Sequence, residues 1–258
     1  MAETVLYEKQ GNIVTITLNR PDALNSINRQ LRRELGEAIQ QFDGEQDSYV
    51  AIITGAGRAF CAGRDLKERA ADNAAGVQAK ASDSMSQDRP FMWPNTWKPT
   101  IAAINGFALA GGWSIAQMCD LRVASEDAQL GITETKWSLL PPFGTTLPKS
   151  LSLSAVLELV FTAQPVTAQR AYEMGFLNRV VAADQVMPEA NKLAGQIAEN
   201  APLAVQYFKE LAYKGQNMAT EDICQMAYQM YDRLLATEDS KEGPRAFAEK
   251  RKPQWQGR

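Results

Sequence analysis

Short, nearly continuous apolar runs limit this chain's fold more than any other feature. Residues 49–54 and 100–104 consist almost entirely of apolar and small side chains, and residues 121–124 form a third candidate. A strand of this composition is typical of a parallel sheet that is covered on both faces. We therefore expect an α/β protein whose parallel strands are joined by right-handed crossovers.

The rest of the chain supports this fold class. The turn pair Gly11-Asn12 separates two predicted strands at residues 5–9 and 13–19. Residues 29–42 carry apolar side chains three or four positions apart, which predicts a helix with Asn28 as its N-cap. The second half is expected to be mainly helical, at residues 152–162, 167–174, 188–199, 202–213, 220–237 and 241–250.

Residues 70–95 interrupt the α/β pattern and are expected to form a mobile insertion. They are rich in Ala, Ser, Asp and Gln. Two interpretations are equally open: a loop that packs its own aromatic residues onto the body, or a lid that supplies an apolar wall to a pocket. Both depend on the large apolar side chains at the end of this region, Phe91, Met92, Trp93, Pro94 and Trp97.

The complete absence of histidine from the 258 residues removes several chemistries. Ser-His-Asp and Cys-His nucleophile pairs, imidazole zinc sites and a histidine general base are all excluded. The three cysteines are far apart and odd in number, which indicates neither a disulfide framework nor a CxxC metal site, so no metal is expected. Acid–base chemistry must therefore fall to Asp, Glu, Lys, Tyr or Cys.

Charge and N-terminal sequence bear on the partners and location of the protein. The formal net charge of −3 argues against a nucleic-acid partner, because such proteins normally need a basic surface. The first ten residues lack an apolar core, so no signal peptide is expected. No apolar run approaches the about 18 residues of a transmembrane helix. Together with the few cysteines, these features predict a cytoplasmic protein without a membrane partner.

Two glycine-containing segments directly follow predicted strands and could present free backbone N–H groups. The first covers residues 55–65 and the second residues 105–114, where Gly111-Gly112 opens a helix that extends to about Met118. The first turn of a helix has unpaired N–H groups at the positive end of its dipole. Taken alone, the first segment is expected to be a loop, and the glycines of the second could merely allow close packing. The second segment does not match the GxGxxG fingerprint, so a dinucleotide site is not expected.

Glu134 is an acid in the mostly apolar neighbourhood of residues 131–144. Burial there would raise its pKa above the usual value of about 4.3 and suit it to proton transfer, although an arbitrary glutamate is more often exposed on a loop. With the two glycine segments it completes a chemical set: paired N–H groups stabilise an enolate oxygen while a carboxylate moves a proton nearby. This chemistry needs no metal or redox cofactor.

Several motifs together resemble the crotonase superfamily, which is the enoyl-CoA hydratase/isomerase family, over nearly the whole chain. Residues 19–25 (NRPDALN) are similar to the family's early CoA-binding loop. Residues 60–67 (FCAGRDLK) and 99–112 resemble its two oxyanion segments. Residues 167–177 match a late pattern of the family, and residues 246–251 are typical of its C-terminal part.

The resemblance implies a fold, an assembly and a substrate class. Residues 1–197 would form a spiral of ββα turns, and residues 198–258 a helical region through which chains associate. A homotrimer, or a hexamer made of two trimers, would result. The substrate would be an acyl-CoA thioester, so that CoA is part of the substrate and no separate cofactor is needed.

The resemblance also assigns roles to individual positions. The backbone N–H groups of Arg64 and Gly111 would hold the thioester oxygen. In the family, C-terminal side chains sometimes reach the CoA of a neighbouring subunit. The residues implied to contact the substrate or its CoA are Ala23, Leu24, Ala62, Asp65, Leu66, Lys67, Trp113, Phe247 and Lys250.

One position departs from the hydratases of the family, which hold a water between two glutamates. The second glutamate falls on Glu134, but the first falls on Ser114, whose hydroxyl is a poor proton acceptor. Ser114 is then a candidate contact for a water or the substrate. A single carboxylate suffices for Δ3-Δ2 isomerisation of an enoyl-CoA, which is the expected activity. Hydration or dehydration of an unusual or bulky acyl-CoA is the alternative.

A non-catalytic binder of acyl-CoA or RNA is an alternative of another class, motivated by the missing glutamate. The net charge of −3 counts against RNA. Trp113, Trp137 and the aromatic cluster near residue 95 suggest an apolar acyl pocket, but the acyl group itself is not specified. Asp120 lies beside a predicted strand and is expected to be structural.

Overall fold

The computed structural model describes residues 3–77 and 96–258, and its strands form two sheets. In the larger sheet the strand order is β1-β2-β3-β5-β7-β10. β1 runs antiparallel to β2, and the other neighbouring strands are parallel. The strands are β1 (Val5–Gln10), β2 (Ile13–Leu18), β3 (Val50–Gly55), β5 (Thr100–Ile104), β7 (Leu121–Ser125) and β10 (Arg179–Val181).

The smaller sheet has the order β4-β6-β8-β9. It consists of β4 (Ala59–Cys61), β6 (Phe107–Leu109), β8 (Gln129–Gly131) and β9 (Val166–Thr167). The chain visits the two sheets alternately, since β3 is followed by β4, β5 by β6 and β7 by β8. Helices follow the first two of these pairs, so the predicted α/β spiral of ββα turns is confirmed.

The helices in chain order cover most of the segments that the apolar spacing predicted. Asn28 caps the first one, because its Oδ1 accepts a hydrogen bond from Leu31 N at 2.8 Å. The α-helices are α1 (Arg29–Gly44), α2 (Leu66–Ala74), α3 (Gly111–Met118), α4 (Leu153–Thr162), α5 (Ala168–Glu173), α6 (Val186–Ala198), α7 (Pro202–Gly215), α8 (Thr220–Leu235) and α9 (Glu238–Ala248). The 3₁₀ helices are η1 (Pro21–Ala23), η3 (Glu134–Trp137), η4 (Pro142–Lys149) and η5 (Ala183–Gln185).

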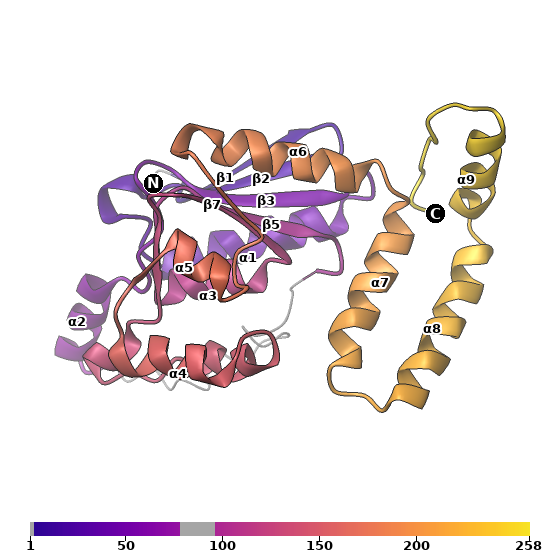
Figure 1. The fold of residues 1–258 in the computed structure, drawn as a ribbon. Helices are drawn as coiled ribbons and strands as arrows, with labels where there is room; N and C mark the ends of the chain where they lie inside the picture. The colour runs from indigo at the N-terminus through magenta and orange to yellow at the C-terminus, as the bar shows by residue number, and fades with distance from the viewer. Residues whose placement is uncertain (1–2, 78–95) are drawn as a thin grey trace.

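Two apolar layers cover the two faces of the six-stranded sheet. Successive side chains of a strand point to opposite faces. Val50 and Ile52 therefore pack on one side, with Ala190 of α6, and Ala51 and Ile53 pack on the other with α1 and the smaller sheet. Figure 1 shows α6 lying along the larger sheet. The predicted burial of β3 on both faces is confirmed.

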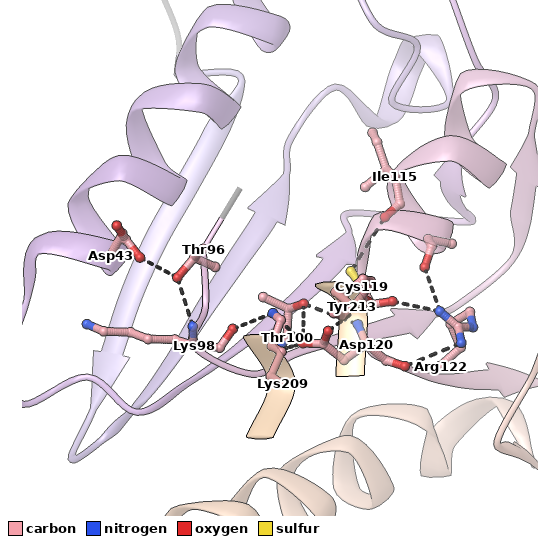
Figure 2. Close-up of polar contacts among 11 residues, drawn as sticks. Asp43, Thr96, Lys98, Thr100, Ile115, Cys119, Asp120, Arg122, Lys209 and Tyr213 are labelled. Carbon is pink, nitrogen blue, oxygen red and sulfur yellow. Dashed lines mark hydrogen bonds and ion pairs between the residues drawn. The ribbon is translucent and has the colours of Figure 1, made fainter. Parts of the chain in front are cut away.

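The C-terminal helices α7, α8 and α9 stand to one side of the sheets (Figure 1). A polar network joins α7 to the core (Figure 2): Asp120 Oδ2 pairs with Lys209 Nζ at 2.7 Å, and Tyr213 OH donates to Asp120 Oδ1 at 3.0 Å. Asp120 is thus structural, as predicted. A division after residue 197 stays a prediction; α6 ends at Ala198 and α7 begins at Pro202.

The insertion predicted at residues 70–95 begins too early in the chain, because α2 extends to Ala74. Its first residues belong to α2, which Asp65 begins as an N-cap by accepting hydrogen bonds from Lys67 N and Glu68 N. Trp97 packs against Tyr213, with ring centroids 6.5 Å apart. The rest of the aromatic cluster, Phe91, Met92, Trp93 and Pro94, lies outside the described residues.

The second half also differs in detail from the prediction. β9 and β10 interrupt the helical half, and the last helix starts at Glu238 rather than at residue 241 because Thr237 caps it. Strands of two or three residues carry no detectable period, so the sequence did not reveal them. Among the helices of the described residues, none is both long enough and apolar enough to cross a bilayer.

Candidate active site

Backbone hydrogen bonds bring three separate loop segments together beside the N-terminus of α3. Ala62 N donates to Leu24 O at 3.0 Å, and Ile27 N donates to Gly63 O at 2.7 Å. Ala110 N, just before α3, donates to Gly131 O at 2.8 Å, which attaches the end of β8 to the same place. Because β4 and β6 are parallel neighbours, residues 23–27, 61–65 and 109–112 meet at the carboxyl ends of strands of the smaller sheet.

Glycine is required for this close approach at two positions. A methyl group on Gly63, whose φ is +93°, would lie 2.9 Å from Leu109 O, and one on Gly112 would lie 2.0 Å from Cys61 O. Ala110, which directly precedes Gly111, has φ 52° and ψ −121°, a backbone conformation that residues other than glycine rarely adopt. Such strain is typical of functional sites.

The amides of Arg64 and Gly111 belong to two backbone segments that lie close together. A methyl group on Gly111 would lie 3.8 Å from Arg64 N and 2.8 Å from Ile27 Cδ1. Neither amide donates a hydrogen bond to another of the described residues. Gly111 also opens α3, so the positive end of the helix dipole adds to its N–H. Two such donors can hold a developing oxyanion.

Glu134 opens η3, three residues after β8 ends. Burial raises the pKa of its carboxyl group to about 7, and the backbone amides of Glu134 and Thr133 offset only part of that shift. Its Oε2 is buried and has no hydrogen-bond partner in the described part of the chain. The predicted upward shift of this pKa is confirmed, and a carboxyl group of this kind can exchange a proton near neutral pH.

Ser114 and Trp113 follow Gly111 on α3 and lie in different surroundings. Ser114 is 1% exposed, and its Oγ has no partner among residues 3–77 and 96–258. Trp113 is completely buried and stacks on Phe176, with ring centroids 3.9 Å apart. Trp113 therefore packs in the core, and its contact with a substrate stays a prediction.

The other residues that the resemblance implied fall into two groups. One group lies in or directly beside the assembled loops, at the end of η1, just after β4 or at the start of α2: Ala23, Leu24, Ala62, Asp65, Leu66 and Lys67. Asp65 also pairs with Arg20 at 2.9 Å, which ties two of these loops together. Phe247 and Lys250 are exposed at the end of α9, a helix far from α2 in Figure 1, so one chain does not bring them to the site.

Three further residues of this region were not identified from the sequence. Asn25 is fully buried at φ 54°, and its Nδ2 donates to Ala56 O at 2.9 Å and Ala59 O at 2.7 Å. Ile27 contacts the Gly111 turn, and Gln117 has a buried, unpaired Oε1. The sequence offered one signal for these three residues, the residue type of Asn25, because asparagine tolerates a positive φ better than most residues.

Comparisons with known proteins agree with this geometry. Residues 8–258 match the family model described as Enoyl-CoA hydratase/isomerase. The chain is 38% identical to a carnitinyl-CoA dehydratase of Proteus mirabilis, with all of both chains covered.

Solved structures are similar over the same length. An enoyl-CoA hydratase from Mycobacterium tuberculosis superposes with a TM-score of 0.90 at 34% identity, and a probable enoyl-CoA hydratase/isomerase from Mycobacterium abscessus with 0.88 at 40%, each with full coverage of both chains. The chain therefore belongs to the enoyl-CoA hydratase/isomerase family, the crotonase superfamily. It is an enzyme of that family acting on acyl-CoA thioesters.

Proposed function

We propose that this enzyme isomerises 3-enoyl-CoA thioesters to 2-enoyl-CoA thioesters, with Glu134 as the carrier of the proton. One observation carries the proposal. Glu134 is a desolvated carboxyl group with an unpaired oxygen, whereas the position that supplies a second acid in the family's hydratases is occupied by the neutral Ser114. One carboxylate can move a proton but cannot both position and split a water as two do.

The proposed reaction uses three groups of this chain. Ionised Glu134 removes a proton from C2, and the electron pair left behind moves toward the thioester carbonyl. The resulting dienolate oxygen accepts hydrogen bonds from the amides of Arg64 and Gly111. Protonated Glu134 then returns the proton to C4, and the double bond lies between C2 and C3. No atom is gained or lost.

The pKa of Glu134 suits both half-reactions. A group that takes a proton from one carbon and returns it to another works best when its pKa lies near the working pH. Burial raises the pKa of Glu134 to about 7, whereas an exposed glutamate would be a weaker base at neutral pH. Within the described residues the causes of the shift are burial, which raises the pKa, and the backbone amides of Glu134 and Thr133, which lower it in part.

Hydration or dehydration is the second candidate. A relative with 38% identity is named a dehydratase, and Ser114 Oγ is a buried polar atom without a partner that could hold a water. In that reaction Glu134 would exchange its proton with the water or hydroxyl at C3. Membership of this enzyme family favours either activity over the non-catalytic acyl-CoA or RNA binder.

Parallel assays of a 3-enoyl-CoA and of crotonyl-CoA distinguish the two activities. We expect wild-type enzyme to shift the double bond of the 3-enoyl-CoA much faster than it hydrates crotonyl-CoA. The Ser114→Glu variant should gain hydration, whereas Ser114→Ala should not. If wild type hydrates crotonyl-CoA faster and Ser114→Ala abolishes that activity, the enzyme is a hydratase.

We also propose that the enzyme forms a homotrimer or a hexamer of two trimers. Large apolar side chains on α4, α7 and α8 support this, because Phe161, Phe208 and Tyr228 are each more than 70% exposed in the single chain. Light scattering of the purified protein measures the assembly. A cytoplasmic location remains a prediction from sequence alone.

A further inference from the structure

A cavity of about 400 Å³ lies between α3, η4 and α7. Its wall includes Ser114 and Gln117 of α3, Phe143 and Thr146 of η4, and Tyr213 and Asn217 at the end of α7. This volume is in the range of small-molecule sites. The cavity begins at the proposed catalytic helix, because Ser114 follows Gly111 by three residues, which is almost one helical turn, or about 5 Å. A thioester held at Gly111 would therefore have its acyl chain near the Ser114 end of this cavity.

Two residues of the α3 wall of this cavity each carry a covered polar atom without a partner among the described residues. Ser114 Oγ and Gln117 Oε1 are both buried and make no hydrogen bond within the described part of the chain. They are three residues apart on α3 and so share one face of the helix. Buried polar atoms are normally paired, and two unpaired ones beside the same cavity indicate a missing hydrogen-bonding group.

The orientation of the Gln117 amide is fixed by its neighbours. Gln117 Nε2 donates to Phe143 O at 2.9 Å and to Thr146 Oγ1 at 3.1 Å. Phe143 O can only accept, so the amide nitrogen must face it and the amide oxygen must face away. Gln117 Oε1 therefore needs a donor, which a hydrocarbon chain or an ionised carboxylate cannot supply.

The charged groups that line the cavity already have partners. The Arg122 guanidinium donates to Phe176 O and to Cys119 O. Cys119 is the C-cap of α3, where carbonyl groups carry partial negative charge. Asp120 is paired with Lys209, and the exposed Lys149 donates to Asn217 Oδ1. A neutral ligand group that both donates and accepts fits these surroundings better than an ion.

The wall opposite α3 is held in place by the network in Figure 2. Tyr213 bonds to Asp120, and Lys209 Nζ, one turn earlier on α7, bonds both to Asp120 and to Lys98 O at 2.8 Å. Lys209 and Asp120 are largely buried, with 7% and 18% of their side chains exposed. The cavity is thus preformed, and α7 belongs to it.

We propose that this cavity receives the distal part of the acyl group and selects an acyl chain with a hydroxyl group several carbons beyond the thioester over a plain hydrocarbon chain. The hydroxyl donates to Gln117 Oε1 and accepts from Ser114 Oγ. This inference rests on the proposed function for the location of the thioester. It adds a substrate class, hydroxylated acyl-CoA, and a specificity-determining residue, Gln117.

Binding of saturated acyl-CoA thioesters tests the inference without turnover. Calorimetry compares an acyl-CoA with a distal hydroxyl and the hydrocarbon acyl-CoA of the same length, across a series of hydroxyl positions. Wild type should bind the best hydroxylated ligand at least about tenfold more tightly, which is the size of one hydrogen bond in a site built for it. In Gln117→Met, which keeps the side-chain length, the preference should disappear while hydrocarbon binding remains.

The exposed Gln41 of α1 provides the matched control, since Gln41→Met should leave the preference unchanged. Ser114→Ala is a second variant if Gln117→Met does not fold, and it should reduce the preference. Equal binding of both ligands by wild type, or tighter binding of an acyl-CoA ending in a carboxylate, would overturn the inference. Failure to bind any acyl-CoA would contradict the proposed function instead, so the two failures are distinguishable.

Discussion

The polar groups around Glu134 and those beneath α7 differ in whether they have hydrogen-bond partners. In the candidate active site Glu134 Oε2, Ser114 Oγ and the Arg64 amide lack partners among the described residues. Beneath α7, Asp120 accepts hydrogen bonds from Thr100 N at 2.7 Å and from the side chains of Tyr213 and Lys209. The contrast agrees with a structural role for the paired groups beneath α7 and with a role in substrate binding for the unpaired groups around Glu134.

Two glutamates show the same contrast in their pKa values. Glu34 of α1 accepts hydrogen bonds from Thr4 Oγ1 and Thr4 N, both at 2.7 Å, and these lower its pKa to about 2. No group in residues 3–77 or 96–258 donates to Glu134 Oε2, and burial raises the pKa of Glu134 to about 7. Hydrogen bonds fix a carboxylate in its ionised form, and their absence leaves it able to exchange a proton.

The largest expected effect follows from removing the acid in the unpaired region. Glu134→Gln should lower kcat about 10²–10⁴-fold, the usual contribution of a positioned base. Steady-state kinetics on the better substrate measure this. The matched control is Glu37→Gln on the exposed side of α1, which should leave kcat unchanged. Full activity of Glu134→Gln would remove the role assigned to this carboxylate.

The next largest effect is expected from a substitution beside the amides of Arg64 and Gly111. Gly111→Ala places a methyl group 2.8 Å from Ile27 Cδ1 and 3.8 Å from Arg64 N, so it should fill the space for the thioester oxygen. We expect a loss of about 10²–10³-fold in kcat, as for the loss of one oxyanion donor. Gly195→Ala in α6 meets nothing within 4 Å and should keep activity. Equal activity of both variants would place the reacting oxygen elsewhere.

The paired region should respond in stability rather than in chemistry. Lys209→Met leaves the largely buried Asp120 without its cation, which should lower the free energy of unfolding by about 3 kcal/mol. Lys192→Met removes an exposed lysine from Glu189, which keeps its pair with Arg179, and should cost less than about 1 kcal/mol. Urea unfolding compares the two variants. Similar midpoints would mean that the network beneath α7 is not needed for the fold.

Stability should also depend on pH. Because the folded pKa of Glu134 is about 7 against a usual 4.5, the folded state keeps a proton that the unfolded chain releases. The resulting stabilisation is complete below pH 4.5 and is lost as the pH rises through 7. We expect the free energy of unfolding of wild type to fall relative to Glu134→Gln across that window. Parallel curves for the two proteins would contradict the raised pKa.

Catalysis should depend on pH in the opposite direction. If Glu134 acts as the base in isomerisation, it must be ionised in the free enzyme, so kcat/KM should rise with pH and level off above an apparent pKa near 7. A pH–rate profile on a 3-enoyl-CoA measures this. A rate that falls over the same range would mean that the protonated form of Glu134 starts the reaction.

The sequence predicted the elements whose side chains repeat with a clear period. β3 and β5 were found because burial on both faces demands continuous apolar side chains, and α1 because its apolar positions fall on one face and Asn28 caps it. β4, β6 and β8 escaped because three residues are too few to show a period. Their existence depends on pairing with strands that are distant in the chain.

For the site, the sequence determined which groups are present: no histidine, one acid at position 134, glycines at 63 and 111, and serine at 114. The family resemblance then assigned a role to each of these groups. The tertiary structure alone decided that the amides of Arg64 and Gly111 lie close together and that Gln117 Oε1 is left without a donor among the described residues. Burial and unpaired hydrogen bonds depend on what distant segments place around a group, and no local sequence pattern contains that information.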